Sequence, residues 1–111
     1  LLGALALGDI GVHFPDTDPA YKGIDSTLLL QKTFSLISDR GYKVVNVDST
    51  LCLEKPKIKP WVPRMQEVIA GILGLQPEDV SVKATTTEQM GFAGREEGLM
   101  AMATVLLTRA E

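Results

Sequence analysis

The segment that most constrains the fold lies near the carboxyl end, where GLMAMATVLLT (residues 98–108) predicts a strand with two apolar faces. One face would carry Leu99, Ala101, Ala103, Val105 and Leu107, and the other Met100, Met102, Thr104, Leu106 and Thr108. A strand that is apolar on both faces is normally covered on both. The helices that a chain of this length can form cover only one face of the sheet. We therefore expect the other face of the sheet to pack against a second copy of the chain or against upstream residues.

Hydrophobic periodicity predicts two helices. The first is expected over residues 26–40, begun by a cap at Asp25 or Ser26 and ended at Gly41. The second is expected over residues 61–73, and Gly74 follows it. The apolar residues 1–7 predict the last turns of a further helix whose beginning lies elsewhere, so we expect the chain to be incomplete at its N-terminus.

Two more strands are expected, over residues 42–54 and 80–86. In the first of these strands, one face is expected to carry Val45, Val47, Leu51 and Leu53. Together the elements predict one α/β domain over residues 1–111. Its fold would be an α+β sandwich, with a mixed sheet of four-stranded type and helices on one face.

Composition argues against several classes of protein. The chain has 111 residues, a net charge of −3 and 5% aromatic residues, and nucleic-acid binding usually needs a basic face. No apolar run reaches the ~18 residues that a membrane-spanning helix needs. The only cysteine is Cys52 and the only histidine is His13, so we expect neither an internal disulfide nor a Cys/His cluster for zinc within these residues.

Three polar clusters are candidates for chemistry: DIGVHFPDTD (residues 9–18), EKPKIKP (54–60) and the segment 85–95. The second and third follow predicted strands, where loops commonly build sites. Threonine hydroxyls and loop amides donate to phosphate oxygens, and lysines supply positive charge. A carboxylate such as Glu88 suits a divalent cation that also binds phosphates. The clusters together suggest a phosphorylated, sugar-bearing ligand of a homo-oligomer.

Each cluster also has an ordinary explanation. Thr85, Thr86 and Thr87 are β-branched residues at the end of a strand, and KPKIKP is a basic turn. Asp16 and Asp18 are turn formers. Arg95 beside two glutamates is a surface ion pair, which contributes little to stability. Residue types and spacing alone leave these alternatives open.

The order and spacing of the motifs resemble one family over nearly the whole chain. The specific pieces are GDIG (8–11), FPDTDP (14–19), PK (56–57) and KATTTEQMGFAGR (83–95). This pattern is similar to that of the 2-C-methyl-D-erythritol 2,4-cyclodiphosphate synthases of the non-mevalonate isoprenoid pathway. The resemblance implies a lyase that converts 4-diphosphocytidyl-2-C-methyl-D-erythritol 2-phosphate to the cyclic diphosphate and CMP. It also implies a homotrimer whose active sites are shared between subunits and whose central channel binds isoprenoid diphosphates in some members.

The resemblance assigns roles to residues by matching position. Asp9 and Gly11 would hold the cytidine ribose. The methylerythritol part would be enclosed by Ile10, Phe14, Pro15, Asp16, Thr17 and Asp18. The cytosine and the phosphates would be cradled by Leu53, Glu54, Lys55, Pro56, Lys57, Ile58 and Lys59. The diphosphate would be bound by Thr85, Thr86 and Thr87, with Thr86 stabilising the transition state. Phe92 and Arg95 would border the site and the channel.

The resemblance also implies two kinds of metal. Glu88 would bind a second divalent cation, Mg²⁺ or Mn²⁺, that bridges the phosphates. The family's main zinc site uses an Asp-x-His motif and a further histidine, and this chain has neither. About the N-terminal third of the family pattern is missing, so we expect the 111-residue chain to be inactive alone. The expected compartment is the bacterial cytoplasm, with a plastid as the alternative.

Two other functions compete with the synthase. A non-catalytic module that binds nucleotides or isoprenoid phosphates would need no metal site. A structural α/β oligomerisation domain would need no ligand. Upstream metal ligands would favour the synthase over the first alternative, and CDP binding would exclude the second.

Overall fold

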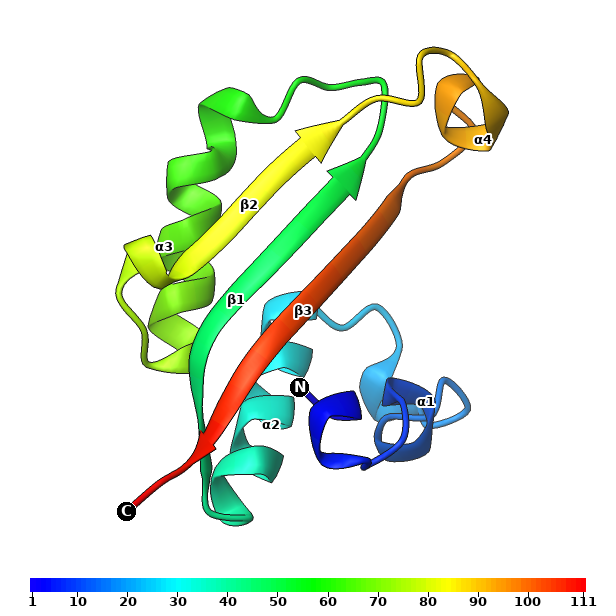
Figure 1. Cartoon of the computed structure of the whole chain (residues 1–111). Coiled ribbons are helices and arrows are strands. Elements are labelled where there is room, and N and C mark those ends of the chain that lie inside the picture. Colours follow the sequence, from blue (N-terminus) through cyan, green and yellow to red (C-terminus); the bar gives the residue numbers. More distant parts are fainter.

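The computed structural model describes all 111 residues, and its sheet has three strands in the order β2-β1-β3 (Figure 1). They are β1 (Tyr42–Cys52), β2 (Val80–Thr85) and β3 (Met100–Arg109). β1 pairs with β2 in parallel and with β3 antiparallel. The mixed sheet was predicted correctly, but four strands were one too many. Residues 9–25 add no strand, because they contain Pro15, Pro19 and turn-forming aspartates.

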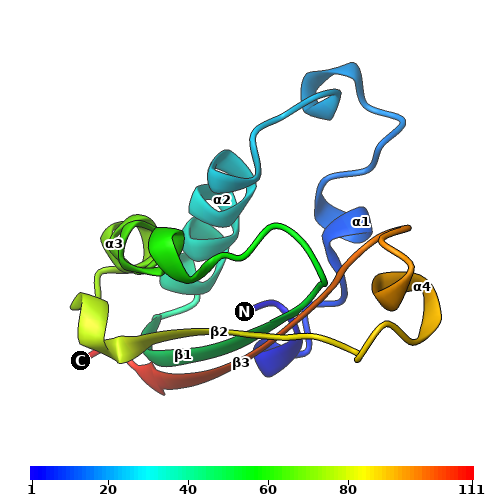
Figure 2. The same ribbon diagram turned by 90° about the horizontal axis from the view of Figure 1, so that it is seen from above.

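The two long helices cover one face of the sheet, as predicted (Figure 2). α2 spans Ser26–Asp39 and α3 spans Val62–Leu73. α2 begins where the Asp25 carboxylate accepts hydrogen bonds from the Thr27 amide and hydroxyl, both at 2.8 Å. These bonds lower the pKa of Asp25. α3 ends at Gly74, whose φ of 72° lies in the left-handed region that glycine adopts without strain.

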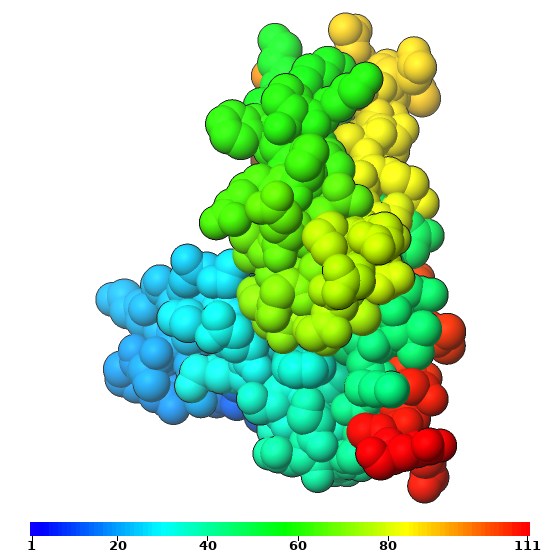
Figure 3. Space-filling view, turned by 90° about the vertical axis from the view of Figure 1, so that its left-hand side faces the viewer, coloured from blue at the N-terminus to red at the C-terminus, as the bar shows by residue number.

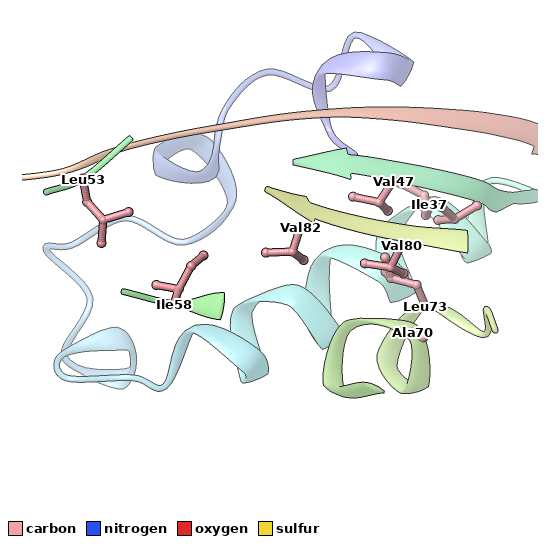
Figure 4. Close-up of a cluster of buried hydrophobic side chains, with 9 residues drawn as sticks. Ile37, Val47, Leu53, Ile58, Ala70, Leu73, Val80 and Val82 are labelled. Atoms are coloured by element: carbon pink, nitrogen blue, oxygen red, sulfur yellow. The ribbon is translucent and has the colours of Figure 1, made fainter. Parts of the chain in front are cut away.

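The core lies between these helices and the sheet (Figure 4). Ile37 of α2 and Val80 of β2 are fully buried, at 0% and 1% exposure. Around them lie other buried side chains from the strands, from α3 and from the loop after β1, namely Val44, Val47, Leu53, Ile58, Ala70, Leu73 and Val82. The core therefore extends up to the loop that follows β1.

The opposite face of the sheet is uncovered. Met102 and Leu106 of β3 are 58% and 54% exposed there. Asp48 and Lys83 form an ion pair on this face at 3.0 Å, which lowers the pKa of Asp48. β3 thus has one face toward the helices and one apolar face toward solvent in the single chain.

A β-bulge in β1 overturns one detail of the expected pattern. The register with β3 shifts between Val44 and Asn46, so Val45 is an extra residue. Val44, at 5% exposure, therefore points into the core, whereas Val45 is 37% exposed. A strict two-residue alternation had placed Val45 on the same face as Val47, because periodicity alone does not locate a bulge.

Short elements make up the remainder of the chain. Residues 1–7 form only the 3-10 turn η1 (Gly3–Leu5) in place of the expected helix end, because Ala6 turns into the left-handed region at φ 56°. The other short elements are α1 (Ile10–His13), η2 (Pro19–Tyr21), η3 (Lys59–Trp61), η4 (Pro77–Asp79) and α4 (Gly91–Gly94). The segment around η2 projects from the body of the molecule (Figure 3). None of the helices has the length and apolar character that a membrane crossing requires.

Candidate functional site

The parallel pairing of β1 and β2 brings two of the three polar clusters together. Cys52 at the end of β1 lies in register with Thr85 at the end of β2. The Leu53 amide continues the pairing by donating to the Thr85 carbonyl oxygen at 3.0 Å. The loops 53–59 and 86–99 therefore leave the same edge of the sheet side by side, at the top of Figure 1. The sequence had predicted that both clusters follow strand ends, and the structure confirms this.

A cavity of about 210 Å³ lies between these two strand ends. Its walls combine buried apolar side chains with lysines and threonines: Leu53, Pro56, Lys57, Ile58, Lys59, Ala84, Thr85 and Thr86. Neither Lys57 nor Lys59 forms an ion pair with an acidic side chain of the chain. An apolar floor with unpaired cations at its rim suits a ligand that has a flat apolar part and an anionic part. Ala84 was not predicted, although it directly precedes the threonines.

The three consecutive threonines differ in what their hydroxyl groups do. Thr85 donates its hydroxyl to the carbonyl oxygen of Thr86 at 3.2 Å, and Thr87 donates to the Met90 carbonyl oxygen. The Thr86 hydroxyl instead accepts a hydrogen bond from the Glu88 amide at 3.4 Å. Its own hydrogen has no acceptor within the chain. Thr86 is therefore the threonine with a donor to offer to a ligand.

Glu54 ties the two loops together. Its Oε1 atom accepts hydrogen bonds from the Gln89 amide at 3.0 Å and from the Thr87 amide at 3.2 Å. The Thr87 hydroxyl oxygen, whose hydrogen is donated to Met90, lies 3.4 Å from the same atom. Sequence reasoning had placed Glu54 among the groups that cradle the ligand. The structure directs its carboxylate to the neighbouring loop.

The loop after β2 has a strained backbone. Glu88 and Gln89 have φ of 56° and 67°, in the left-handed region that costs a residue with a side chain roughly 1–2 kcal/mol. Hydrogen bonds of amides to a carboxylate, each about 1.5–3 kcal/mol, are large enough to offset this cost. Gly94 of α4 lies directly against the same turn. A Cβ atom at this position would be 2.1 Å from the Gln89 carbonyl carbon, so only glycine fits without a shift of the backbone.

The residues present do not fit a zinc site. No three side chains of the His, Cys, Asp and Glu types come together in a way that could hold a metal ion. The single histidine, His13, has its Nε2 atom 2.7 Å from the Leu7 carbonyl oxygen. Glu88 is exposed, and its carboxylate forms no ion pair with a lysine or arginine. One free carboxylate matches the way Mg²⁺ is commonly held between a protein and a phosphate ligand.

The first polar cluster lies elsewhere in the single chain. In Figure 1, α1 lies to the right of the lower half of β3, apart from α4 at the top. Asp9 caps α1 by accepting from the Val12 amide at 3.1 Å, and Asp9 and Ile10 line a separate cavity of about 540 Å³. Asp18 accepts from the Ala20 amide at 2.9 Å, and Phe14 packs edge-on against Tyr21. Gly11, Pro15, Asp16 and Thr17 belong to the same segment, so one chain does not bring all three clusters into one site.

Other charged residues of the two loops form ion pairs. Arg95 contacts both carboxylate oxygens of Glu97, at 2.8 and 3.2 Å, and Lys55 lies 3.7 Å from Glu96. Both pairs are exposed, so they contribute little to stability. Phe92 of α4 is 44% exposed beside them.

Comparison with known proteins adds independent information on this chain. The profile of the YgbB family matches residues 1–108. The chain is 56% identical over 109 residues to the 2-C-methyl-D-erythritol 2,4-cyclodiphosphate synthase of Bacteroides thetaiotaomicron. The matched region covers 98% of this chain and 69% of that protein.

Solved structures with a similar fold were also found. The bifunctional IspDF of Campylobacter jejuni has a TM-score of 0.92 at 40% identity, over 97% of this chain and 29% of that one. IspF of Plasmodium falciparum, in a complex with CDP, has a TM-score of 0.85 at 29% identity, over 99% of this chain and 65% of that one.

The contact between Gly94 and Gln89 generates a first prediction. Gly94→Ala should lower the free energy of unfolding by about 1–3 kcal/mol, because the added methyl group forces two backbone segments apart. Gly71→Ala is the matched control, since a Cβ atom at this helical position meets nothing within 4 Å. That change should raise stability by roughly 0.5–1 kcal/mol. Urea unfolding measures both, and a Gly94→Ala variant as stable as the unmodified chain would contradict the packing described.

Proposed function

The chain belongs to the YgbB family, and we propose that it forms the diphosphate-binding part of a 2-C-methyl-D-erythritol 2,4-cyclodiphosphate synthase. The reaction converts 4-diphosphocytidyl-2-C-methyl-D-erythritol 2-phosphate to the 2,4-cyclodiphosphate and CMP. The observation that carries the proposal is the shared strand end, where Lys57, Lys59 and Thr86 line one cavity. A cytidine diphosphate has the flat ring and the anionic part that such a cavity suits.

The reaction is a phosphoryl transfer within one substrate molecule. An oxygen of the 2-phosphate bonds to the phosphorus of the diphosphate that is attached to methylerythritol. The bond from that phosphorus to the oxygen bridging to the cytidine phosphate breaks, and CMP leaves with that oxygen. No oxidant, reductant or water is consumed. Catalysis then depends on holding the two phosphates in line and on neutralising their charge.

The residues of the loops suit this task. The Thr86 hydroxyl would donate to a phosphate oxygen as charge develops on it, in the manner of an oxyanion hole. Lys57 and Lys59 would reduce the repulsion between the phosphates. Leu53 and Ile58 supply an apolar floor on which the cytosine ring would lie. The loop after β2 would thus serve the diphosphate and the loop after β1 the base.

The residues of this chain suit one of the two metals that the family resemblance implies, the cation bound with the diphosphate, and do not suit the other, zinc. Glu88 would supply the carboxylate for a divalent cation whose other ligands come from the diphosphate, and such a cation neutralises phosphate charge. A zinc site with several protein ligands does not fit the residues of this chain.

We further propose that the site is completed by a second copy in a homotrimer. Two facts support this: Asp9–Asp18 lies apart from the cavity in one chain, and the outer face of β3 is apolar and exposed. Packing this face against neighbouring copies would remove Met102 and Leu106 from water and contribute about 25 cal/mol per Å² of apolar surface. Neighbouring copies would then supply the ribose-binding Asp9 and Gly11.

Turnover of the substrate tests the proposed function. The chain alone should release no CMP, because it lacks the ligands for zinc. The Bacteroides thetaiotaomicron relative can supply the residues that precede the region matching this chain. Joining those residues to the N-terminus of this chain, before Leu1, should restore CMP release in the presence of zinc and Mg²⁺. Phosphorus NMR would follow substrate and cyclic product. A folded, metal-loaded fusion that binds CDP without turnover would instead support a non-catalytic binding module, and CMP release by the chain alone would overturn its predicted inactivity.

Thr86→Ala in the active fusion should lower kcat by roughly ten- to a thousand-fold, as loss of one oxyanion-type donor does. The KM should change less, because the interaction strengthens in the transition state. Ser38→Ala, which removes an exposed hydroxyl of α2 away from both loops, is the control and should leave kcat within about threefold. Full activity of Thr86→Ala would show that this hydroxyl has no role in the chemical step.

Met102→Lys should convert the trimer to monomers, because it places three charges at one apolar interface. Sedimentation velocity measures the change. Leu28→Lys, at an exposed apolar position of α2, is the control and should leave the trimer intact. A Met102→Lys variant that still sediments as a trimer would mean that another surface mediates assembly.

A further inference from the structure

We propose that Glu54 is a positioning residue, whose carboxylate holds the loop after β2 in the shape that presents Thr86 and Glu88 to the diphosphate. This inference rests on the proposed function, since that function identifies the ligand as a diphosphate. Glu54 itself would not touch the ligand. It would act through the backbone of the neighbouring loop.

The Glu54 carboxylate is directed toward the loop after β2. It leaves the loop after β1 and accepts from two amides of the other loop, at Thr87 and Gln89, 33 and 35 residues further along the chain. It forms no ion pair with a lysine or arginine, even though lysines follow it in the sequence. The Glu54 carboxylate therefore contacts amide donors of the other loop. If the same carboxylate faced the ligand directly, its negative charge would repel a diphosphate.

The two amides that donate to Glu54 determine the course of the backbone between them. They flank Glu88, so a single oxygen atom fixes the chain on both sides of that residue. Both Glu88 and the next residue, Gln89, have left-handed backbone conformations. Residues with side chains adopt two such conformations in succession only when the surroundings hold them there. Without the acceptor, the turn would relax toward ordinary conformations.

This turn also orients the Thr86 hydroxyl. In the held conformation the Glu88 amide donates to the Thr86 hydroxyl oxygen at 3.4 Å. That contact orients the hydroxyl so that its hydrogen stays available for a phosphate oxygen. Relaxation of the turn would move the Glu88 carboxylate and the Thr86 hydroxyl together. Glu54 therefore acts on both groups that would meet the diphosphate.

Two variants separate this role from a direct role of the Glu54 charge. Glu54→Gln keeps the length of the side chain and an acceptor oxygen but removes the charge. Glu54→Asp keeps the charge but is one methylene shorter, so it cannot reach both amides. A positioning role predicts that the Gln variant is close to the unmodified chain and the Asp variant is impaired. A residue that binds a cation would show the reverse order.

The experiment uses the ¹⁵N-labelled 111-residue chain and two probes, CDP and cytidine, each titrated with Mg²⁺ and followed by NMR. For Glu54→Asp, the Kd for CDP should rise about tenfold while the Kd for cytidine stays the same. Amide exchange at Thr87 and Gln89 should become at least about tenfold faster, with the exchange of the Val80 amide unchanged. Glu54→Gln should stay within about threefold in every measurement. Glu67→Asp, an exposed carboxylate on α3, is the control and should have no effect.

Three results would overturn the proposal: both variants behaving like the unmodified chain, the reverse order, or equal losses for CDP and cytidine. If Glu54→Asp does not fold, Glu54→Gln decides alone, because loss of amide protection at Thr87 and Gln89 in that variant contradicts the role. If the unmodified chain binds no CDP, the proposed function fails. The exchange rates still report whether Glu54 holds the loop, so the two failures are distinguishable.

Discussion

The parallel pairing of β1 with β2 is the constraint on which the candidate site depends. Parallel strands end at the same edge of a sheet, so the register that joins Cys52 to Thr85 makes neighbours of two loops that are about 30 residues apart in sequence. α3 connects the two strands and packs over the sheet, as a parallel pair requires. Val80 and Val82 bury one face of β2 against this helix. The core therefore fixes the position of the threonines at the end of the same strand.

The loops add a second level of organisation above this edge. Their backbone is not relaxed, since Glu88 and Gln89 are left-handed and Gly94 is pressed against Gln89. Strain of this kind persists only where hydrogen bonds and packing oppose it, and such positions are concentrated at functional sites. Here the opposing bonds come from Glu54, on the other loop. The geometry of the loop that carries Thr86 and Glu88 thus depends on both strand ends.

Much of this architecture could be predicted from the sequence, because the long elements have strong periodic patterns. α2, α3 and the three strands lie close to their predicted bounds. The bulge at Val45 could not be predicted, since an inserted residue leaves the apolar pattern of the strand almost unchanged. The contact of Glu54 with Thr87 and Gln89 was missed for a different reason: it is long-range, and nothing local distinguishes this glutamate from a solvated one. The different hydrogen bonds of the Thr85, Thr86 and Thr87 hydroxyl groups likewise depend on loop conformation. The roles assigned to individual residues stay predictions.

The central claim is that the two strand ends of one chain form the cytidine diphosphate site, which a neighbouring copy completes. A crystal structure of the CDP complex with Mg²⁺ tests it most directly. The account predicts a phosphate oxygen within hydrogen-bond distance of the Thr86 hydroxyl, the cytosine against the loop 53–59, and Asp9 of another copy at the ribose. CDP bound instead in the cavity lined by Asp9, Ile10 and Leu30 of a single chain, away from Thr86, would contradict it.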